Sequence, residues 1–377
     1  MERAEVAVVG AGITGLSLAF FLASDGADVV ILERSSIAAE ASGIQPGGVR
    51  QQWSTRVNCV LAREATRFYE SLSDQLHRRV DAQLERCGYL FVAVSDGMLE
   101  SLRANVALQN ELGIPSRLVD PDEAAELVPG LATESMTGAS WCGEDGYFDK
   151  PQTVVEAFAA AAQERGARLQ IREVDRIERD GDSWRVETRS GPLLAGQVVV
   201  AAGVDTPRLL APLGAAVPIE AEARHLFFSE PVTERLVEPL VVVGERGFAA
   251  KQLANGRVLS SDLAAAGDPT ARREEWRRTV AAGIAEFLPV LSFVSFPIFA
   301  SGYYDLTADH QPIVGAVPGN DGVWMAAGYS GHGFMLAPAI SRRLASAVLE
   351  GAPARPIEEF ALDRFDGTGP SVESQIV

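Results

Sequence analysis

VAVVGAGITGLSLAF, residues 6–20, decides the fold of this 377-residue chain and allows two interpretations. It can be the apolar part of an export signal or the first turn of a nucleotide-binding fold. An export signal needs a basic leader and an unbroken apolar run. Here the leader MERAE carries charges of both signs, and three glycines interrupt the run, which weakens a helix and leaves it too short to cross a bilayer. We therefore reject the export signal and expect a cytoplasmic protein.

The segments around this stretch alternate as strand, helix and strand. Residues 4–10 predict a short buried parallel strand, residues 12–23 a helix that is apolar on most faces, and residues 27–32 a second strand. An acid, Glu33, follows the second strand directly. This order is typical of the unit that opens a dinucleotide-binding fold, in which such an acid hydrogen-bonds a ribose hydroxyl.

The glycines of GAGITG each have a role in that unit. Gly10 makes the tight turn after the strand, Gly12 lets the backbone approach a pyrophosphate, and Gly15 allows close packing of the helix on the strand. The N-terminus of the helix faces the phosphates. Because the strand, the helix, the second strand and the acid follow one another in the order and spacing of this unit, the sequence predicts dinucleotide binding.

Composition excludes several other functions. With 47% hydrophobic and 22% charged residues the chain is an ordinary globular protein, and its length predicts one to three domains. The net charge of −18 repels phosphate backbones and anionic lipid, so we expect no nucleic acid, no membrane surface and no membrane insertion. Three scattered cysteines and four scattered histidines predict neither a disulfide framework nor a metal site.

The choice between FAD and NAD depends on three loops. Residues 33–53 form a loop rich in small residues, where a simple NAD dehydrogenase would continue with strands and helices. Residues 197–210 and 323–338 each predict a strand, a small-residue turn and the start of a helix, the second helix running to about Glu350. Three such loops converge on one ligand only if it is long, which favours FAD.

These residues carry a resemblance that covers the chain except about its last dozen residues. The sequence resembles the D-amino acid oxidase superfamily of flavoproteins, in the branch with monomeric sarcosine oxidase, glycine oxidase and the β subunits of sarcosine oxidase and L-proline dehydrogenase complexes. The motifs are GAGITG with Glu33, SGIQPGGVRQQW (42–53), VVVAAGVDT (198–206), TADHQPIVG (307–315) and AAGYSGHGFMLAP (326–338).

The resemblance implies an α/β plus α+β fold. A Rossmann-type FAD-binding domain (residues 1–85, 148–212 and 306–377) would be interleaved with a substrate-binding domain (86–147 and 213–305), whose antiparallel sheet roofs the flavin. Among the local segments, the patterns predict one helix over 61–76, a helix that begins at Pro151, one strand over 168–177 and a mobile tail over 367–377.

The resemblance also assigns residues to the cofactor. Val174 would touch the adenine through its backbone, and the turn with His332 would meet the pyrimidine end of the flavin. Gly302 stands where monomeric sarcosine oxidase attaches FAD through a cysteine, so we expect non-covalent FAD; Lys150 stands near the FMN-binding histidine of the heterotetrameric enzyme, so we expect no second flavin. The predicted cofactor-binding residues are Gly10, Gly12, Ile13, Thr14, Gly15, Glu33, Arg34, Ser42, Gly43, Gly47, Gly48, Val49, Val174, Ala202, Gly203, Gly302, Gly331, His332, Gly333 and Phe334.

Oxidation of an amine moves a hydride from the α-carbon to flavin N5 and gives an imine that hydrolyses. The protein must then supply cations and hydrogen-bond donors, and we predict four such catalytic residues. Arg50 matches an arginine against the flavin face; its alternative is a surface ion pair. Lys251 aligns with a lysine that assists oxygen reduction; its alternative is a solvated edge residue. His225 either lines the pocket or is an ordinary structural histidine.

The fourth residue, Tyr304, marks a departure from the family. It stands where glycine oxidase has a carboxylate-binding arginine, and Met335 replaces the second carboxylate-binding cation of monomeric sarcosine oxidase. Tyr304 can still donate a hydrogen bond to a carboxylate. These two differences point to a larger or less polar substrate.

The leading hypothesis is an FAD-dependent oxidoreductase that oxidises the CH–NH bond of an amino acid or N-alkyl amino acid, with O2 or a redox partner as acceptor. A second makes the chain the flavin subunit of a dehydrogenase complex with a partner subunit; GGVRQQW favours it, whereas Lys251 favours O2. A third is a flavin-dependent hydroxy-acid oxidoreductase. A nicotinamide-only dehydrogenase and a non-enzymatic binding module fit these residues worst.

Overall fold

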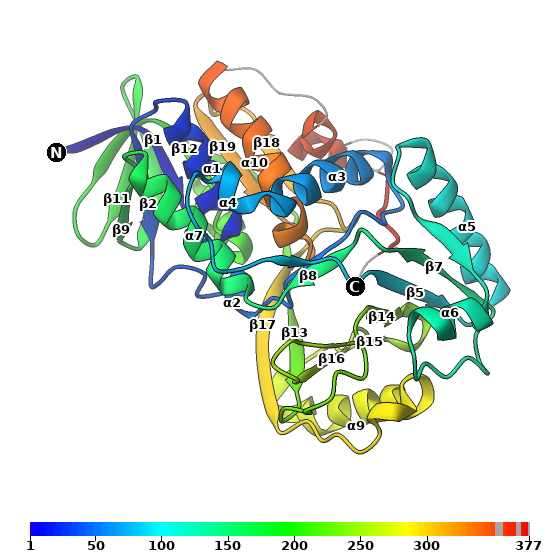
Figure 1. The fold of residues 1–377 in the computed structure, drawn as a ribbon. Helices are drawn as coiled ribbons and strands as arrows, with labels where there is room; N and C mark the ends of the chain where they lie inside the picture. Colours follow the sequence, from blue (N-terminus) through cyan, green and yellow to red (C-terminus); the bar gives the residue numbers. More distant parts are fainter. Residues whose placement is uncertain (351–356, 367–370, 376–377) are drawn as a thin grey trace.

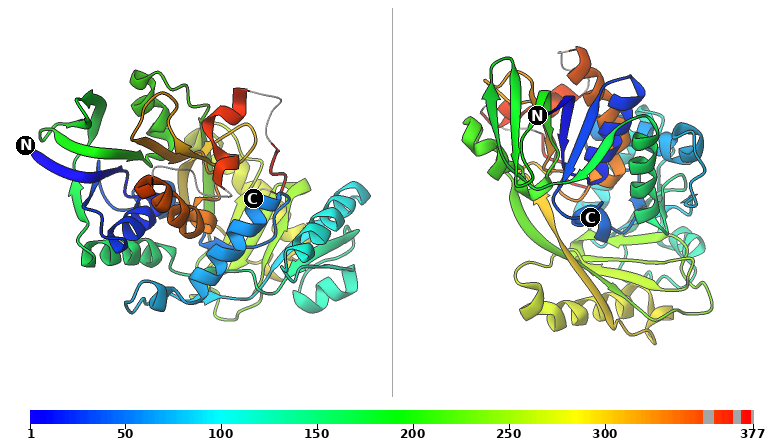
Figure 2. Two further views of the ribbon diagram at one scale, coloured as in Figure 1. Left: turned by 90° about the horizontal axis from the view of Figure 1, so that it is seen from above. Right: turned by 90° about the vertical axis from the view of Figure 1, so that its left-hand side faces the viewer.

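Two large sheets share the chain in the computed structural model, which describes residues 1–350, 357–366 and 371–375. Figure 1 shows them as two stacked bodies, the first with most of the helices and the second above α9 (Pro269–Phe287). The long paired strands β13 (Glu220–Phe228) and β17 (Ile298–Leu306) connect the bodies, as the side view in Figure 2 also shows. The mixed α/β class expected from the sequence is confirmed.

The first sheet has the predicted parallel centre. The centre of the sheet is formed by four parallel strands in the order β12, β1, β2 and β9. Strand β19 pairs in parallel with the C-terminal residues of β12. Val29 to Glu33 of β2 are all buried, as expected for a strand covered on both faces. The bounds are β1 Glu2–Val9, β2 Val29–Glu33, β9 Arg168–Ile171, β10 Val174–Asp180, β11 Ser183–Thr188, β12 Leu193–Val200, β18 Ile313–Ala316 and β19 Val323–Ala327.

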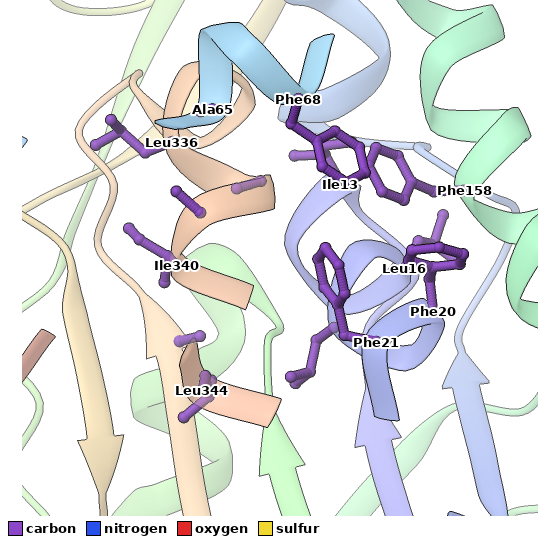
Figure 3. Close-up of a cluster of buried hydrophobic side chains, with 14 of the residues drawn as sticks. Ile13, Leu16, Phe20, Phe21, Ala65, Phe68, Phe158, Leu336, Ile340 and Leu344 are labelled. Carbon is purple, nitrogen blue, oxygen red and sulfur yellow. The ribbon is translucent and has the colours of Figure 1, made fainter. Parts of the chain in front are cut away.

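Four helices pack together on one face of this sheet, as Figure 3 shows. The helix that begins within GAGITG, α1, is buried from Ile13 to Ala23. Burial of each large apolar side chain contributes about 1.5–3 kcal/mol to the stability of the fold. This core fixes the phosphate-facing end of the helix. The bounds are α1 Ile13–Ser24, α3 Arg56–Glu70, α7 Pro151–Glu164 and α10 Gly333–Glu350. In the part of the chain that the structure describes, no helix is both long and apolar enough to span a membrane.

The second sheet has eight strands in the order β17-β13-β16-β15-β14-β5-β7-β6. All pairs among these described strands are antiparallel except β14 with β5, which run parallel. The exception arises where strands from 213–305 meet those from 86–147. The bounds are β5 Tyr89–Ala93, β6 Arg117–Val119, β7 Gly138–Cys142, β14 Leu240–Val243, β15 Phe248–Gln252 and β16 Val258–Asp262, with α5 Asp96–Glu111 and α6 Pro121–Leu127 beside them. The domain boundaries predicted from the sequence remain a proposal.

Shorter elements fill the connections between these bodies. Strands β3 (Gly48–Val49), β4 (Leu84–Glu85) and β8 (Gly146–Phe148) form a small third sheet. The loop 33–53 contains the four-residue helix α2 (Ala41–Ile44). A short helix α8 (Thr206–Leu210) follows the turn after β12.

Two local predictions are corrected by the structure. The helix predicted over 61–76 begins earlier, at Arg56, and ends at Glu70, with α4 (Leu72–Gln75) as a separate turn. The strand predicted over 168–177 is two strands, because β9 pairs in parallel with β2 whereas β10 pairs antiparallel with β11. In the strand order β10-β11-β12-β1-β2-β9 these two strands lie at opposite ends, so one continuous strand cannot form both pairings, and the strand is interrupted at Arg172 and Glu173.

The prediction of a mobile tail is wrong for residues 371–375, which are packed against the protein; residues 367–370 and 376–377 lie outside the described residues. Glu373 is fully buried, and its main-chain N–H donates to the carbonyl of Asp309 at 3.0 Å. Such polar contacts with distant residues leave no periodic pattern in the sequence, so composition alone suggested mobility.

Candidate functional site

A cavity lies between the two sheets, from Glu33 at the end of β2 to Leu240 on β14. The C-terminal ends of β1, β2 and β12 form its floor, where open α/β sheets bind their ligands. Strands β13, β15, β16 and β17 form its roof.

The turn between β1 and α1 has the geometry that its glycines predict. Gly10 has a φ of +108°, and a Cβ atom there would lie 2.4 Å from the carbonyl oxygen of Ala201. A Cβ on Gly15 would lie 2.1 Å from the carbonyl oxygen of Gly10. Backbone therefore packs on backbone at both positions, and the N-terminus of α1 opens on the cavity, where it can bind a phosphate.

Glu33 is held beside this turn. Its Oε2 accepts the N–H of Ala11 at 2.9 Å, and its Oε1 accepts the N–H of Ser35 at 2.9 Å. Arg34 pairs with Glu40 at 2.6 Å and with Asp205, and so ties the loop after β2 to the turn after β12. Val174 is buried in the cavity wall on the same side. A carboxylate fixed in this way is placed for a ribose hydroxyl.

The turn between β19 and α10 forms the other end of the floor. His332 is 1% exposed, and neither ring nitrogen has a hydrogen-bond partner among the described residues. Burial, with the charge of Arg50 second, holds the pKa of His332 well below its usual value, so the ring is neutral at pH 7. A buried polar ring without a partner indicates a ligand. A Cβ on Gly331 would lie 2.3 Å from the Tyr304 ring, so the turn also contacts the roof.

Most of the predicted cofactor-binding residues line the cavity. Gly15, Gly43, Gly47 and Val49 do not; a Cβ on Gly43 or Gly47 would collide with a backbone oxygen, so these glycines serve backbone packing. The residues on the cavity wall are Gly10, Gly12, Ile13, Thr14, Glu33, Arg34, Ser42, Gly48, Val174, Ala202, Gly203, Gly302, Gly331, His332, Gly333 and Phe334.

Of the four predicted catalytic residues, Tyr304 has its side chain at the cavity and His225 does not. His225 is among the wall residues, but its ring stacks on Trp276 of α9, with the ring centroids 4.6 Å apart. Burial, aided by the neighbouring Arg224 charge, lowers the pKa of His225 to about 4. The ring is therefore uncharged at pH 7 and packs in the core between the roof strand β13 and α9. This placement fits the interpretation of His225 as an ordinary structural histidine.

Arg50 lies behind the cavity wall and is completely buried. Its guanidinium donates to the carbonyls of Gln52 and Gln375 and lies 3.7 Å from the centre of the Trp53 ring. Trp53 in turn contacts His332 edge-on, with the ring centroids 4.5 Å apart. In this structure Arg50 is connected to the cavity wall by contacts through Trp53 to His332, and its alternative as a surface ion pair does not apply.

Lys251 is also fully buried and is not among the wall residues. Its ammonium donates to the carbonyl of Pro46 at 2.6 Å and lies 3.5 Å from the centre of the Tyr147 ring. Burial lowers the pKa of Lys251 to about 7, with the Asp149 charge opposing the shift. Lys251 is therefore not a solvated edge residue. Through its hydrogen bond to Pro46 it supports the loop 33–53 from the side away from the cavity.

This lowered pKa predicts a pH-dependent stability. Between pH 7 and 10 the unfolded chain keeps the Lys251 proton while the folded chain has lost it, so unfolding becomes less favourable as the pH rises. Relative to Lys251→Met, the free energy of unfolding of the wild type should rise by up to about 1.4 kcal/mol per pH unit in this window. Urea unfolding of both proteins at pH 7, 8, 9 and 10 measures this; parallel curves for the two proteins would contradict it.

Two residues of the cavity were missed by the sequence analysis. Asp305, at the end of β17, accepts the N–H of Gly328 at 2.7 Å and holds the β19–α10 turn; burial raises its pKa to about 6. Arg224 lies one residue before His225, directly opposite Gly302 in the pairing of β13 with β17. Its guanidinium lies 5.5 Å from the centre of the Tyr304 ring. Strand register, which the sequence did not reveal, decides which neighbour faces the cavity.

The cavity fits FAD in three respects. The glycine turn places the N-terminus of α1 at the cavity wall for a pyrophosphate, Glu33 is placed for a ribose, and the neutral His332 has two ring nitrogens without a partner among the described residues at the other end. Gly302 lies against α2, since a Cβ there would be 2.8 Å from Ile44. No cysteine is among the described wall residues.

Several known proteins are similar to this chain along most of its length. The family model for FAD dependent oxidoreductases (DAO) matches residues 5–347. The chain is 27% identical to FAD-dependent oxidoreductase domain-containing protein 1 of Xenopus laevis, over 100% of this chain and 85% of that protein. It is 27% identical to glycine oxidase of Geobacillus kaustophilus, over 97% of this chain and 98% of that one. The crystal structure of L-proline dehydrogenase from P. horikoshii superposes with a TM-score of 0.91 at 28% identity, covering 98% of this chain and 99% of that one.

Proposed function

The chain belongs to the family of FAD dependent oxidoreductases, and from that premise we propose that it oxidises the CH–NH bond of an amino acid or N-alkyl amino acid with an apolar side chain. The observation that carries the proposal is a cation and a phenol, Arg224 and Tyr304, side by side on the cavity face of the roof. FAD is proposed to bind without a covalent bond. The glycine oxidase and L-proline dehydrogenase among the similar proteins act, by their names, on a primary and a secondary amino acid.

Arg224 and Tyr304 form the proposed carboxylate site. They lie on adjacent strands of the roof, on the face that Gly302 shares. Arg224 also pairs with Glu222 and donates to the carbonyl of Ala265 at 3.0 Å, so its guanidinium is held in place. Burial raises the pKa of Tyr304, so its hydroxyl stays protonated and can donate. Arg224 on the neighbouring strand would thus supply the cation that, by the resemblance, glycine oxidase has at position 304.

The rest of the roof indicates an apolar side chain on the substrate. Six of its described wall residues are aliphatic, Ser261 and Tyr303 each add a hydroxyl, and beside Arg224 and Asp305 no other Asp, Glu, Lys or Arg from 213–305 is among the described wall residues. Asp305 is engaged by the backbone of the β19–α10 turn. A second charge on the substrate would lack a partner there and pay a desolvation penalty. The aliphatic wall residues are Leu226, Leu240, Ala249, Ala250, Leu259 and Leu263.

When bound, FAD supplies the hydride acceptor for the α-carbon. The chain itself binds and orients. Glu33 and the Gly10 turn would hold the cofactor's ribose and phosphates, and the neutral His332 could donate or accept one hydrogen bond at the flavin end. Arg224 and Tyr304 fix the carboxylate, and the aliphatic roof excludes water.

The proposal is tested with a set of amino acids and one hydroxy acid. Leucine, proline and N-methylleucine, in both chiral forms, are compared with glycine, with glutamate and with the 2-hydroxy acid of the leucine skeleton. An artificial dye and O2 serve as alternative acceptors, so that an oxidase and a dehydrogenase are both detected. We expect a 2-oxo acid together with ammonia or methylamine from the acyclic amino acids, an imine from proline, and no turnover of the hydroxy acid.

Turnover of the hydroxy acid alone would replace the proposal with the hydroxy-acid alternative. Faster turnover with the dye than with O2 would favour a redox partner, including a partner subunit, as the natural acceptor. Turnover of glycine or glutamate in preference to leucine would contradict the apolar substrate class while leaving the amine oxidation intact.

A further inference from the structure

The C-terminal segment Ser371–Gln375 lies across both bodies of the protein. It contacts the first body through Gln311, whose side chain donates to the carbonyl of Ser371. It contacts the second through Asn105 of α5, which donates to the side chain of Gln375 at 3.0 Å. The residues of this segment are thus held at both ends.

Glu373 is the centre of this contact. Its carboxylate accepts the main-chain N–H groups of Ser54 at 2.9 Å and Thr55 at 3.1 Å, and the side chain of Asn58 at 3.0 Å. Both hydroxyls, of Ser54 and Thr55, donate to it as well. The carboxylate therefore occupies the N-terminus of the 15-residue helix α3, where a negative charge is stabilised and otherwise unpaired N–H groups are satisfied.

From this segment a chain of contacts leads to the cavity. The carbonyl of Gln375 accepts the guanidinium of Arg50, which covers the Trp53 ring; Trp53 contacts His332 on the cavity wall. The Nε–H of Arg50 has no partner in the described residues. A buried guanidinium with so few acceptors depends on each of them, because an unpaired buried charge is strongly unfavourable.

We propose that the C-terminal segment is a positioning element of the cofactor site and that Glu373 is its anchoring residue. Glu373 fixes the start of α3 and the carbonyl of Gln375; these hold Arg50 and Trp53 in place; Trp53 sets the position of the neutral His332 ring. The inference depends on FAD occupying the cavity and not on which substrate is oxidised.

The test compares Glu373→Ala and the isosteric Glu373→Gln with a control, Glu134→Ala. Glu134 is an exposed carboxylate near the end of α9, since Ala132 bonds to the carbonyl of Phe287. The measurements are the Kd of FAD for the apoprotein, by fluorescence quenching, and the visible spectrum of bound flavin. We expect FAD to bind about 10–100-fold more weakly to both Glu373 variants, as for loss of a charge-assisted contact, with shifted flavin bands, and no change for Glu134→Ala.

The melting temperature of the full-length proteins separates positioning from general destabilisation. It is measured for the wild type, Glu373→Gln and Glu134→Ala, each loaded with FAD, beside the FAD affinity and the spectrum. The weaker FAD affinity and the shifted flavin bands of Glu373→Gln should persist at a temperature well below its melting transition. If Glu373→Gln lowers the melting temperature while the FAD affinity and spectrum stay at wild-type values, the segment is merely structural and the inference is overturned.

Discussion

Replacing Gly10 with alanine is expected to give a protein that purifies without flavin. The added Cβ would lie 2.4 Å from the carbonyl oxygen of Ala201. That oxygen cannot move away easily, because β1 and β12 are paired along their lengths and Ala201 donates to the carbonyl of Val9 at 2.8 Å. The turn and the end of β12 must separate, and both line the cofactor cavity. We expect the FAD affinity to fall by at least about 100-fold, the effect of some 3 kcal/mol.

The matched control is Gly26→Ala, in the turn after α1. Gly26 has a φ of +92°, close to the +108° of Gly10, but no atom lies within 4 Å of the position a Cβ would take. Both substitutions therefore carry the left-handed backbone strain of about 1–2 kcal/mol, and only one has the collision. The measurement is FAD bound per chain and the Kd of the reconstituted protein. Equal flavin contents in the two variants would show that the collision does not matter.

Replacing Arg224 with alanine is expected to lower kcat/KM for an amino acid by about 10²–10³-fold. Removing one partner of a buried charged contact costs about 2–5 kcal/mol. The loss should disappear with the decarboxylated amine of the same skeleton, for which wild type and variant should be equally poor. Arg224→Lys should recover part of the activity, because it restores the charge without the planar fork.

The control for this change is Arg246→Ala, an exposed arginine on a turn of the same sheet. It should leave kcat/KM within about twofold of the wild type, as most surface substitutions have small effects. FAD content is measured in both variants, so that a lost cofactor is not taken for a lost substrate contact. An Arg224→Ala protein that is fully loaded with FAD and turns over amino acids normally would rule out Arg224 as the carboxylate site.

The parts of the fold that depend on local spacing could be predicted from the sequence. Gly10, Gly12 and Glu33 lie within one strand–helix–strand unit, so their separations along the chain fix their positions in space. The floor of the cavity follows from such units. The family of the chain was identified from the same motifs and is confirmed by the match over residues 5–347.

The roof could not be predicted in the same way, because its geometry depends on strand register. A shift of one residue moves a side chain to the other face of a sheet. Arg224 and His225 are neighbours in sequence, yet one lies by Tyr304 and the other stacks on Trp276 of α9. The buried tail was missed for a related reason, since Glu373 is held by polar groups 315–319 residues away.

The measurement that tests the account most directly is the visible spectrum of the purified protein, recorded without oxygen before and after addition of leucine, proline or N-methylleucine and, separately, of the 2-hydroxy acid of the leucine skeleton. The account predicts the two absorption bands of oxidised flavin, about one FAD per chain released by acid, and bleaching by at least one of the amino acids. A protein that carries FAD but is bleached only by a 2-hydroxy acid would contradict the proposed substrate class. A colourless protein that neither releases nor takes up FAD would contradict the assignment of the cavity itself.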